Sequence, residues 1–186
     1  LRLHSNFSLA EGMLSFEHVS KYCLVNNQPA IAITDTNNLF GALEFCLKMT
    51  SNGIQPIIGI QVNISQNCKD DIDIGEVVLL AKNELGYKNL LHLMNIFSSN
   101  EKYEKFISGI DLEQYNDGLI MLSGGVENGF LAKPASLNNK KLLQDRLKYL
   151  KNIFNDNLYI ELQRHGIKSQ LIAEKNLINL AYEHDI

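Results

Sequence analysis

Short apolar runs alternate with longer amphipathic segments along the whole chain. Short runs rich in Val and Ile predict buried strands, and apolar residues three and four positions apart predict helices. Strands are expected over residues 1–4, 30–34, 56–63, 76–81, 118–122 and 157–163. Helices are expected over residues 16–26, 39–51, 87–98, 139–154 and 169–182.

Local signals support several of these boundaries. Ser15 can cap the first helix, and Asn52-Gly53 should end the second. Residues 66–73 are polar and predict a surface loop, whereas residues 99–110 are weakly patterned and are expected to be irregular.

The alternation of strands and helices predicts an α/β fold with a parallel sheet and right-handed crossovers. Six strands are fewer than the seven or eight that usually close a barrel. The sequence stops where another strand would be due, and its first residue is not Met. We therefore expect residues 1–186 to be the N-terminal fragment of a longer chain, with a barrel that is incomplete at its C-terminal end.

Composition narrows the classes of function. The chain has 186 residues, 45% of them hydrophobic, and a formal net charge of −4. The nearest approach to a basic stripe, in residues 140–151, favours a solvated helix face, so this piece is not expected to form the main DNA-binding groove. No apolar run approaches the ~18 residues that would span a bilayer. Three cysteines without a CxxC pair favour a reducing compartment, and hence the cytoplasm.

Several polar residues follow the predicted strands, where parallel barrels carry their functional side chains. His4, Asp35 and His165 come from three different strands, and Gln61 lies near the end of a fourth. His and carboxylate ligands suit zinc or manganese. Spacing alone leaves a second interpretation open, because a lone His at a strand end is more often a hydrogen-bonded structural residue.

Other polar features favour structural interpretations. The remaining histidines lie in helical patterns and are expected at the surface or in packing contacts: His18, His92 and His184. Asp70, Asp71 and Asp73 lack the Gly and terminal Glu of an EF-hand, so they predict a solvated loop. Ser123-Gly124-Gly125 could bind an anion or form a tight turn.

An ordered set of motifs resembles one known family. The segments are LRLHSNFSLAEGML, PAIAITDTNNLFGALEF, GIQPIIGIQVNIS, VVLLAKNELGYKNLLHLMNI, GLIMLSGGVENG and LYIELQRHG. In this order they resemble the PHP (polymerase and histidinol phosphatase) domain. LAKNELGYKNLLHL is similar to the branch found in the alpha subunits of bacterial polymerase III, the replicative family C polymerases. The resemblance implies a distorted, TIM-like seven-stranded (β/α) barrel that holds a cluster of divalent metals in its intact form.

The resemblance also implies which positions should hold those metals. His4, Glu11 and His165 match ligand positions, and Asp35 matches the Asp of a Thr-Asp-His motif. Three further ligand positions carry residues that are poor ligands: Arg2, Thr36 and Gln61. We expect no metal cluster here, and we expect the remaining cleft residues to pair with one another, for example Arg2 with Glu11 or Asp35.

The resemblance implies that the parent chain is a DNA-directed DNA polymerase. Its catalytic carboxylates and Mg²⁺ would lie outside residues 1–186, and this domain would be a non-catalytic scaffold. The implied partners are the rest of the polymerase chain, a proofreading exonuclease subunit and other replisome subunits, with DNA bound through the parent chain and no membrane. Two alternatives are an active phosphoesterase or 3′–5′ exonuclease that uses Zn²⁺ or Mn²⁺, and a stand-alone binding protein.

Overall fold

The structure is a computed structural model that describes residues 2–66, 74–99, 106–125 and 127–186. Its main helices are α1 (Phe16–Val25), α2 (Ala42–Ser51), α3 (Glu84–Ser99), α4 (Gly109–Gln114), α5 (Ala132–Ser136), α6 (Lys140–Phe154) and α7 (Lys168–His184). The strands are β1 (Ala30–Thr36), β2 (Gln55–Ser65), β3 (Ile74–Ala81), β4 (Ile107–Ser108), β5 (Leu119–Leu122) and β6 (Leu158–Tyr159). In the described ranges none of the helices is long and apolar enough to cross a membrane.

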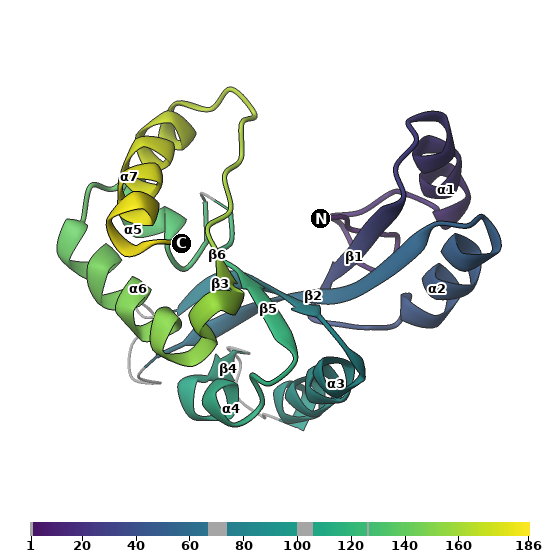
Figure 1. The fold of residues 1–186 in the computed structure, drawn as a ribbon, viewed down its shortest axis with the longest axis horizontal. Coiled ribbons are helices and arrows are strands. Elements are labelled where there is room, and N and C mark those ends of the chain that lie inside the picture. The colour runs from purple at the N-terminus through teal and green to yellow at the C-terminus, as the bar shows by residue number, and fades with distance from the viewer. Residues whose placement is uncertain (1, 67–73, 100–105, 126) are drawn as a thin grey trace.

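These strands form one mixed sheet with the order β1-β2-β3-β5-β6, and β4 pairs with the far end of β2. As Figure 1 shows, α1 and α2 lie at one end of the sheet, α3 and α4 lie below its middle, and α5, α6 and α7 lie at the other end. β1 and β6 form the two edges of this path, so the sheet is not closed within the described residues. The expected α/β fold with an incomplete barrel is confirmed.

The expectation of an all-parallel sheet is wrong at β3. This strand runs antiparallel to both β2 and β5, whereas the pairs β1–β2, β2–β4 and β5–β6 are parallel. Only eight residues separate the end of β2 at Ser65 from the start of β3 at Ile74. A parallel crossover needs a dozen or more residues, so this connection favours an antiparallel pair.

The strand expected over residues 1–4 is also wrong, because residues 2–4 adopt no strand conformation. Leu3 nevertheless lies beside β1, where its carbonyl accepts a hydrogen bond from Thr34 N at 2.9 Å. The Leu3 amide donates to the Thr34 hydroxyl at 3.1 Å. Since a side chain replaces one backbone partner, the ladder does not extend.

Several other boundaries differ from the sequence-based expectations. β6 ends at Tyr159 rather than near Gln163, because the amide two residues later, Glu161 N, donates to the Ser123 hydroxyl at 2.9 Å and not to a backbone carbonyl. Residues 107–114 form β4 and α4, and α5 was not expected at all. The cap of α1 is as expected, with Ser15 accepting a hydrogen bond from the His18 amide, and Asn139 caps α6 in the same way by accepting from the Leu142 amide.

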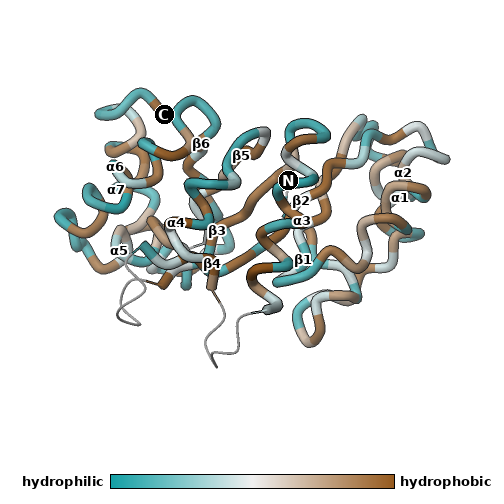
Figure 2. The backbone as a smooth tube through the Cα atoms, turned by 90° about the horizontal axis from the view of Figure 1, so that it is seen from below, coloured by the Kyte–Doolittle hydropathy of each residue, from teal (hydrophilic) through white to brown (hydrophobic). Residues whose placement is uncertain are grey.

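The core lies mainly between the sheet and helices α3, α6 and α7. Alternate residues of β3 face this core, among them Val77 and Leu79, which are fully buried. Arg146 of α6, expected on a solvated face, is buried instead; it lies 4.3 Å from the Phe130 ring centroid and donates to the Phe130 carbonyl at 2.8 Å. In Figure 2, hydrophobic residues, coloured brown, follow the central strands.

The opposite face of the sheet is much less covered. Val78, Leu80 and Leu122 point to this face and form a small separate cluster with Ala32. An apolar cavity of about 670 Å³ opens over it, between β2, β3, β5 and the strand β6. The two faces of one sheet thus differ in how completely their apolar side chains are packed.

Two of the three cysteines lie within the described residues. Cys23 and Cys46 are free thiols. Burial raises the pKa of both. Cys68, Asp70, Asp71 and Asp73 lie outside the described residues.

Candidate functional site

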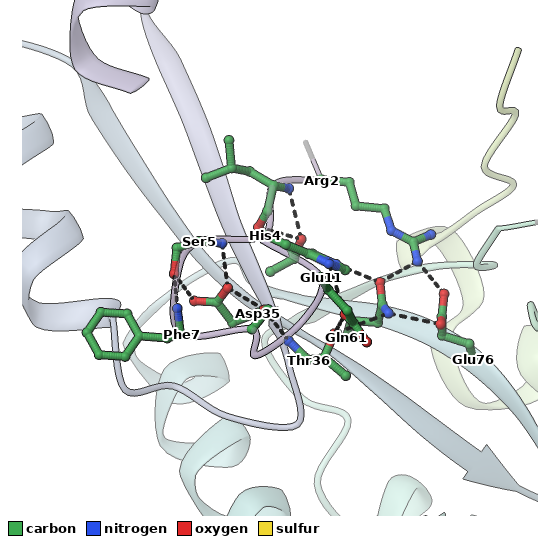
Figure 3. A network of polar contacts seen from close by, with 12 residues as sticks. Arg2, His4, Ser5, Phe7, Glu11, Asp35, Thr36, Gln61 and Glu76 are labelled. Carbon is green, nitrogen blue, oxygen red and sulfur yellow. Dashed lines mark hydrogen bonds and ion pairs between the residues drawn. The ribbon is translucent and has the colours of Figure 1, made fainter. Parts of the chain in front are cut away.

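Polar side chains gather where β1 ends, beside Gln61 in the second half of β2. Thr36 and Gln61 are paired across these strands, and the antiparallel β3 brings Glu76 to the same end. The segment at residues 2–11 and the segment after β6 meet them there. Figure 3 shows how these side chains converge.

The Arg2 guanidinium is the centre of the first group of contacts. Its Nη2 donates to Gln61 Oε1 and to Glu76 Oε1. Its Nη1 lies 3.2 Å from both carboxylate oxygens of Glu161. Gln163 Nε2 donates to Glu161 at 2.7 Å. One fixed positive charge therefore joins Gln61 of β2, the start of β3 and the segment after β6.

His4 and Thr36 form a second, smaller group. His4 Nε2 lies 2.9 Å from Gln61 Oε1, and His4 Nδ1 lies 3.1 Å from Glu11 Oε2. The same Glu11 oxygen accepts a hydrogen bond from the Thr36 hydroxyl. Gln61 Nε2 donates to Glu76 at 2.9 Å, which links this group to the Arg2 contacts.

Asp35 lies on the far side of β1 from Arg2 and has a different environment. Its side chain is 2% exposed and accepts three short hydrogen bonds, from Ser5 N and Ser5 Oγ at 2.7 Å and from Ser8 Oγ at 2.6 Å. The loop that supplies these donors folds back tightly. A Cβ at Gly12 would lie 2.1 Å from the Ser5 carbonyl oxygen, so only glycine fits.

His165 lies farther from these groups. It lines a polar cavity of about 280 Å³ together with Arg2 and Glu76. Its backbone amide donates to Gln170 Oε1 at 2.7 Å, and its imidazole makes no hydrogen bond to any residue that the structure describes. The four residues expected at or after strand ends, His4, Asp35, Gln61 and His165, thus lie at the same end of the sheet, which we call the mouth, although only His4 and Gln61 are hydrogen-bonded to each other.

The family model for the PHP domain matches residues 1–165. The chain belongs to the PHP domain family. The resemblance to this family is thus confirmed.

The chain is also similar over nearly its whole length to bacterial proteins named DNA polymerase III subunit alpha. It is 36% identical to the one from Borreliella burgdorferi and 37% identical to the one from Rickettsia conorii, with 98% of the chain covered in each case. The protein from Caulobacter vibrioides is 34% identical, with 100% of the chain covered. The chain spans only 15–17% of the length of these relatives.

A solved structure shares the fold. A Bifidobacterium adolescentis protein named as a metal-dependent phosphoesterase superposes with a TM-score of 0.56 and 13% sequence identity. The match covers all of this chain and 83% of that protein. At this identity the likeness concerns the PHP-type fold alone.

Sequence reasoning missed two acidic residues of this site, Glu76 and Glu161. Glu76 was assigned to the start of a parallel strand, which would place it at the opposite end of the sheet, and Glu161 was placed inside a longer β6. The predicted strands leave twelve residues between them, enough for a parallel crossover, and only the observed eight-residue β2–β3 connection signals the reversal of β3 that brings Glu76 here. The expected pairing of Arg2 with Glu11 or Asp35 is wrong. Arg2 binds Glu76 and Glu161, and Glu11 binds His4.

Proposed function

We propose that this chain is the N-terminal PHP region of a bacterial replicative DNA polymerase alpha subunit, and that this region is a scaffold and not a metal-dependent phosphoesterase. The observation that carries the proposal is the position of Arg2. Its guanidinium occupies the mouth of the sheet and is bound by Gln61, Glu76 and Glu161. DNA synthesis, with its catalytic carboxylates and Mg²⁺, would belong to other parts of the parent polymerase.

The residues at the mouth do not fit a cluster of divalent ions. A guanidinium has no lone pair to offer a metal, and it stays charged at all accessible pH values. If a metal ion lay ~4 Å from the Arg2 guanidinium, at an effective dielectric near 20, the repulsion would cost about 4 kcal/mol for each unit of metal charge. The two nearest carboxylates, Glu76 and Glu161, are already engaged in ion pairs with Arg2. Among the described residues, no three His, Cys, Asp or Glu side chains are grouped so that they could hold a metal ion.

The scaffold proposal includes partners. The domain would support the rest of the polymerase chain in the cytoplasm and present a surface patch to a proofreading exonuclease subunit, with other replisome subunits joined through the parent chain. The formal charge of −4 supports DNA contact through other domains. Exonuclease capture by the full-length parent should survive substitution of the mouth residues Gln61 and His165. Loss of capture on those changes alone would contradict a surface patch.

The decisive experiment is elemental analysis of the full-length polymerase, with a phosphodiesterase assay alongside. We expect no stoichiometric Zn²⁺ or Mn²⁺ and no hydrolysis by this domain. The triple change Arg2→His, Thr36→His and Gln61→Glu should restore measurable binding of one of these metals. The matched control replaces Arg2 by Lys with the same other two changes; because it keeps the positive charge, it should bind no metal.

The opposite result would identify an active enzyme. Full metal occupancy and phosphodiester hydrolysis in the unmodified chain, both lost on His165→Ala, would overturn the scaffold proposal. The polymerase part of the proposal is tested separately by the length of the reading frame. A frame of around a thousand residues or more supports it by domain-count reasoning, and a frame that ends soon after Ile186 would indicate a stand-alone binding protein.

A further inference from the structure

Helix α6 is strongly basic in a chain that is acidic overall. Five of its residues are basic and only Asp145 is acidic, so the helix carries a net charge of +4. The whole chain carries −4, so the remaining residues must carry −8. The basic residues of α6 are Lys140, Lys141, Arg146, Lys148 and Lys151.

Two of these five basic side chains are used within the domain. Arg146 is buried, where its guanidinium lies over the Phe130 ring and donates to the Phe130 carbonyl. The Lys151 ammonium donates to the His184 carbonyl at the end of α7. These contacts hold α6 in place and leave the other three basic side chains for the surface.

The other three, Lys140, Lys141 and Lys148, are exposed and form no ion pair with any residue that the structure describes. We call these three residues the α6 lysine face. Lys141 and Lys148 are seven residues apart, so they lie on one side of the helix, about 10 Å apart along its axis. The opposite side packs into the core through Leu143 and Leu150. In Figure 1, α6 lies on the outside of the fold, at the end of the sheet away from α1 and α2.

The exposed residues of α6 are all polar or charged, which favours a nucleic-acid backbone over a protein as the partner. They are Lys140, Lys141, Gln144, Asp145, Lys148 and Asn152. The buried centre of a protein–protein interface is enriched in aromatic residues and depleted of lysine. Lysine ammonium groups bind phosphate oxygens as point charges, and none of these exposed residues is an aromatic on which a base could stack.

We infer that the α6 lysine face is an auxiliary contact for the phosphate backbone of DNA, beside a main DNA-binding groove in other domains. The inference rests on the proposed function, since the DNA is the substrate of the parent polymerase. The negative charge of the rest of the domain repels phosphates, which steers DNA toward α6 and away from the other surfaces. Backbone contacts carry no sequence information, so this contact is independent of base sequence and weakens as the salt concentration rises.

Asp145 provides a test of opposite sign. It is exposed, lies about one helical turn from both Lys141 and Lys148, and forms no ion pair with a described residue. Its carboxylate repels an approaching phosphate. Removing this charge should therefore strengthen DNA binding, whereas removing the lysines should weaken it.

The test measures the affinity of the full-length polymerase for a fluorescent primer–template duplex with a single-stranded overhang, over a range of salt concentrations. The double change Lys141→Gln and Lys148→Gln should weaken binding roughly tenfold at low salt, and lower the slope of log K against log salt by about 1.8, or about 0.9 for each lysine. Asp145→Asn should tighten binding several-fold. The matched control is Lys21→Gln with Lys88→Gln, which removes the same charge from exposed side chains of α1 and α3 and should leave both quantities nearly unchanged.

Three results would overturn the inference: unchanged affinity and slope in the Lys141 and Lys148 variant, equal losses in the control, or loss of a separate subunit with DNA affinity unchanged, which would assign the face to an acidic protein. DNA synthesis by the unmodified chain is measured in the same preparation. A chain that synthesises DNA but gives one of these results disproves the α6 contact and leaves the proposed function standing. A full-length chain that synthesises no DNA disproves the proposed function itself.

Discussion

The two sides of the mouth stabilise their carboxylates in opposite ways. On one side, Asp35 is buried and accepts bonds only from uncharged donors, the Ser5 amide and the hydroxyls of Ser5 and Ser8. On the other side, Glu76 and Glu161 are partly exposed and share a single cation, Arg2. A carboxylate that accepts hydrogen bonds from fixed N–H and O–H donors needs no counter-ion, whereas two neighbouring carboxylates repel each other unless a cation lies between them.

This difference separates the contacts that hold a loop in place from those that balance charge between strands. The Asp35 contacts fix the loop of residues 5–14 onto β1, so they would be required whether or not the mouth held a metal. The Arg2 contacts supply the positive charge that Glu76 and Glu161 share. The predictions below test this contrast, beginning with the largest expected effect.

Replacing Asp35 by Ala should be the most damaging single change at the mouth. It leaves the buried donors of Ser5 and Ser8 without an acceptor, and a loss of roughly 3 kcal/mol or more is expected in the free energy of unfolding. Urea unfolding of the 186-residue chain measures it. Glu11→Ala, which removes an exposed carboxylate from the same mouth, is the control and should cost far less. Equal losses would show that burial of Asp35 does not set its importance.

Lengthening the chain should have the next largest effect. β1 and β6 each have an unpaired edge in the described sheet, and an apolar cavity of about 670 Å³ lies on the less covered face beside them. A chain extended past Ile186 by one strand and one helix is expected to melt roughly 4–8 °C higher, for a gain of about 2 kcal/mol. Calorimetry of the 186-residue chain and the extended chain measures the two melting temperatures. No increase would argue against a strand that bridges the two edges.

Replacing Arg2 by Ala should cost less than losing Asp35. The change leaves Glu76 and Glu161 facing each other without a cation, but both carboxylates can reach water, so about 1–2 kcal/mol is expected. Because the interaction is ionic, the loss should shrink in 1 M salt. Arg2→Lys keeps the charge and should retain part of the stability. A salt-independent loss would indicate that Arg2 acts through packing instead.

The sequence predicted the order of the elements well and their directions less well. The periodic helices α1, α6 and α7 begin and end within about two residues of expectation, because local propensity and amphipathic spacing decide them. The direction of β3 depends on which strands it pairs with in the folded chain. The only local indication of it is the short connection between β2 and β3. The partners of Arg2 follow from that direction, so an error in one strand led to an error in the site.

The smallest effect is expected at Glu17, an exposed residue on α1 that tests whether any surface ion pair matters here. The Lys48 ammonium, and to a lesser extent that of Lys21, lowers the pKa of the Glu17 carboxyl. A carboxyl with a lowered folded pKa contributes its stability above its unfolded pKa and loses it as the pH falls through the folded value. Glu17→Gln should therefore lower the unfolding midpoint slightly near pH 7 and not at all at strongly acidic pH, where the native residue is also uncharged. Glu44→Gln is the control, because Glu44 is exposed on α2 and forms no ion pair with a described residue, and it should leave the midpoint unchanged at every pH. A Glu17→Gln effect that persists in acid would show that the side chain contributes by packing between α1 and α2, and not by its charge.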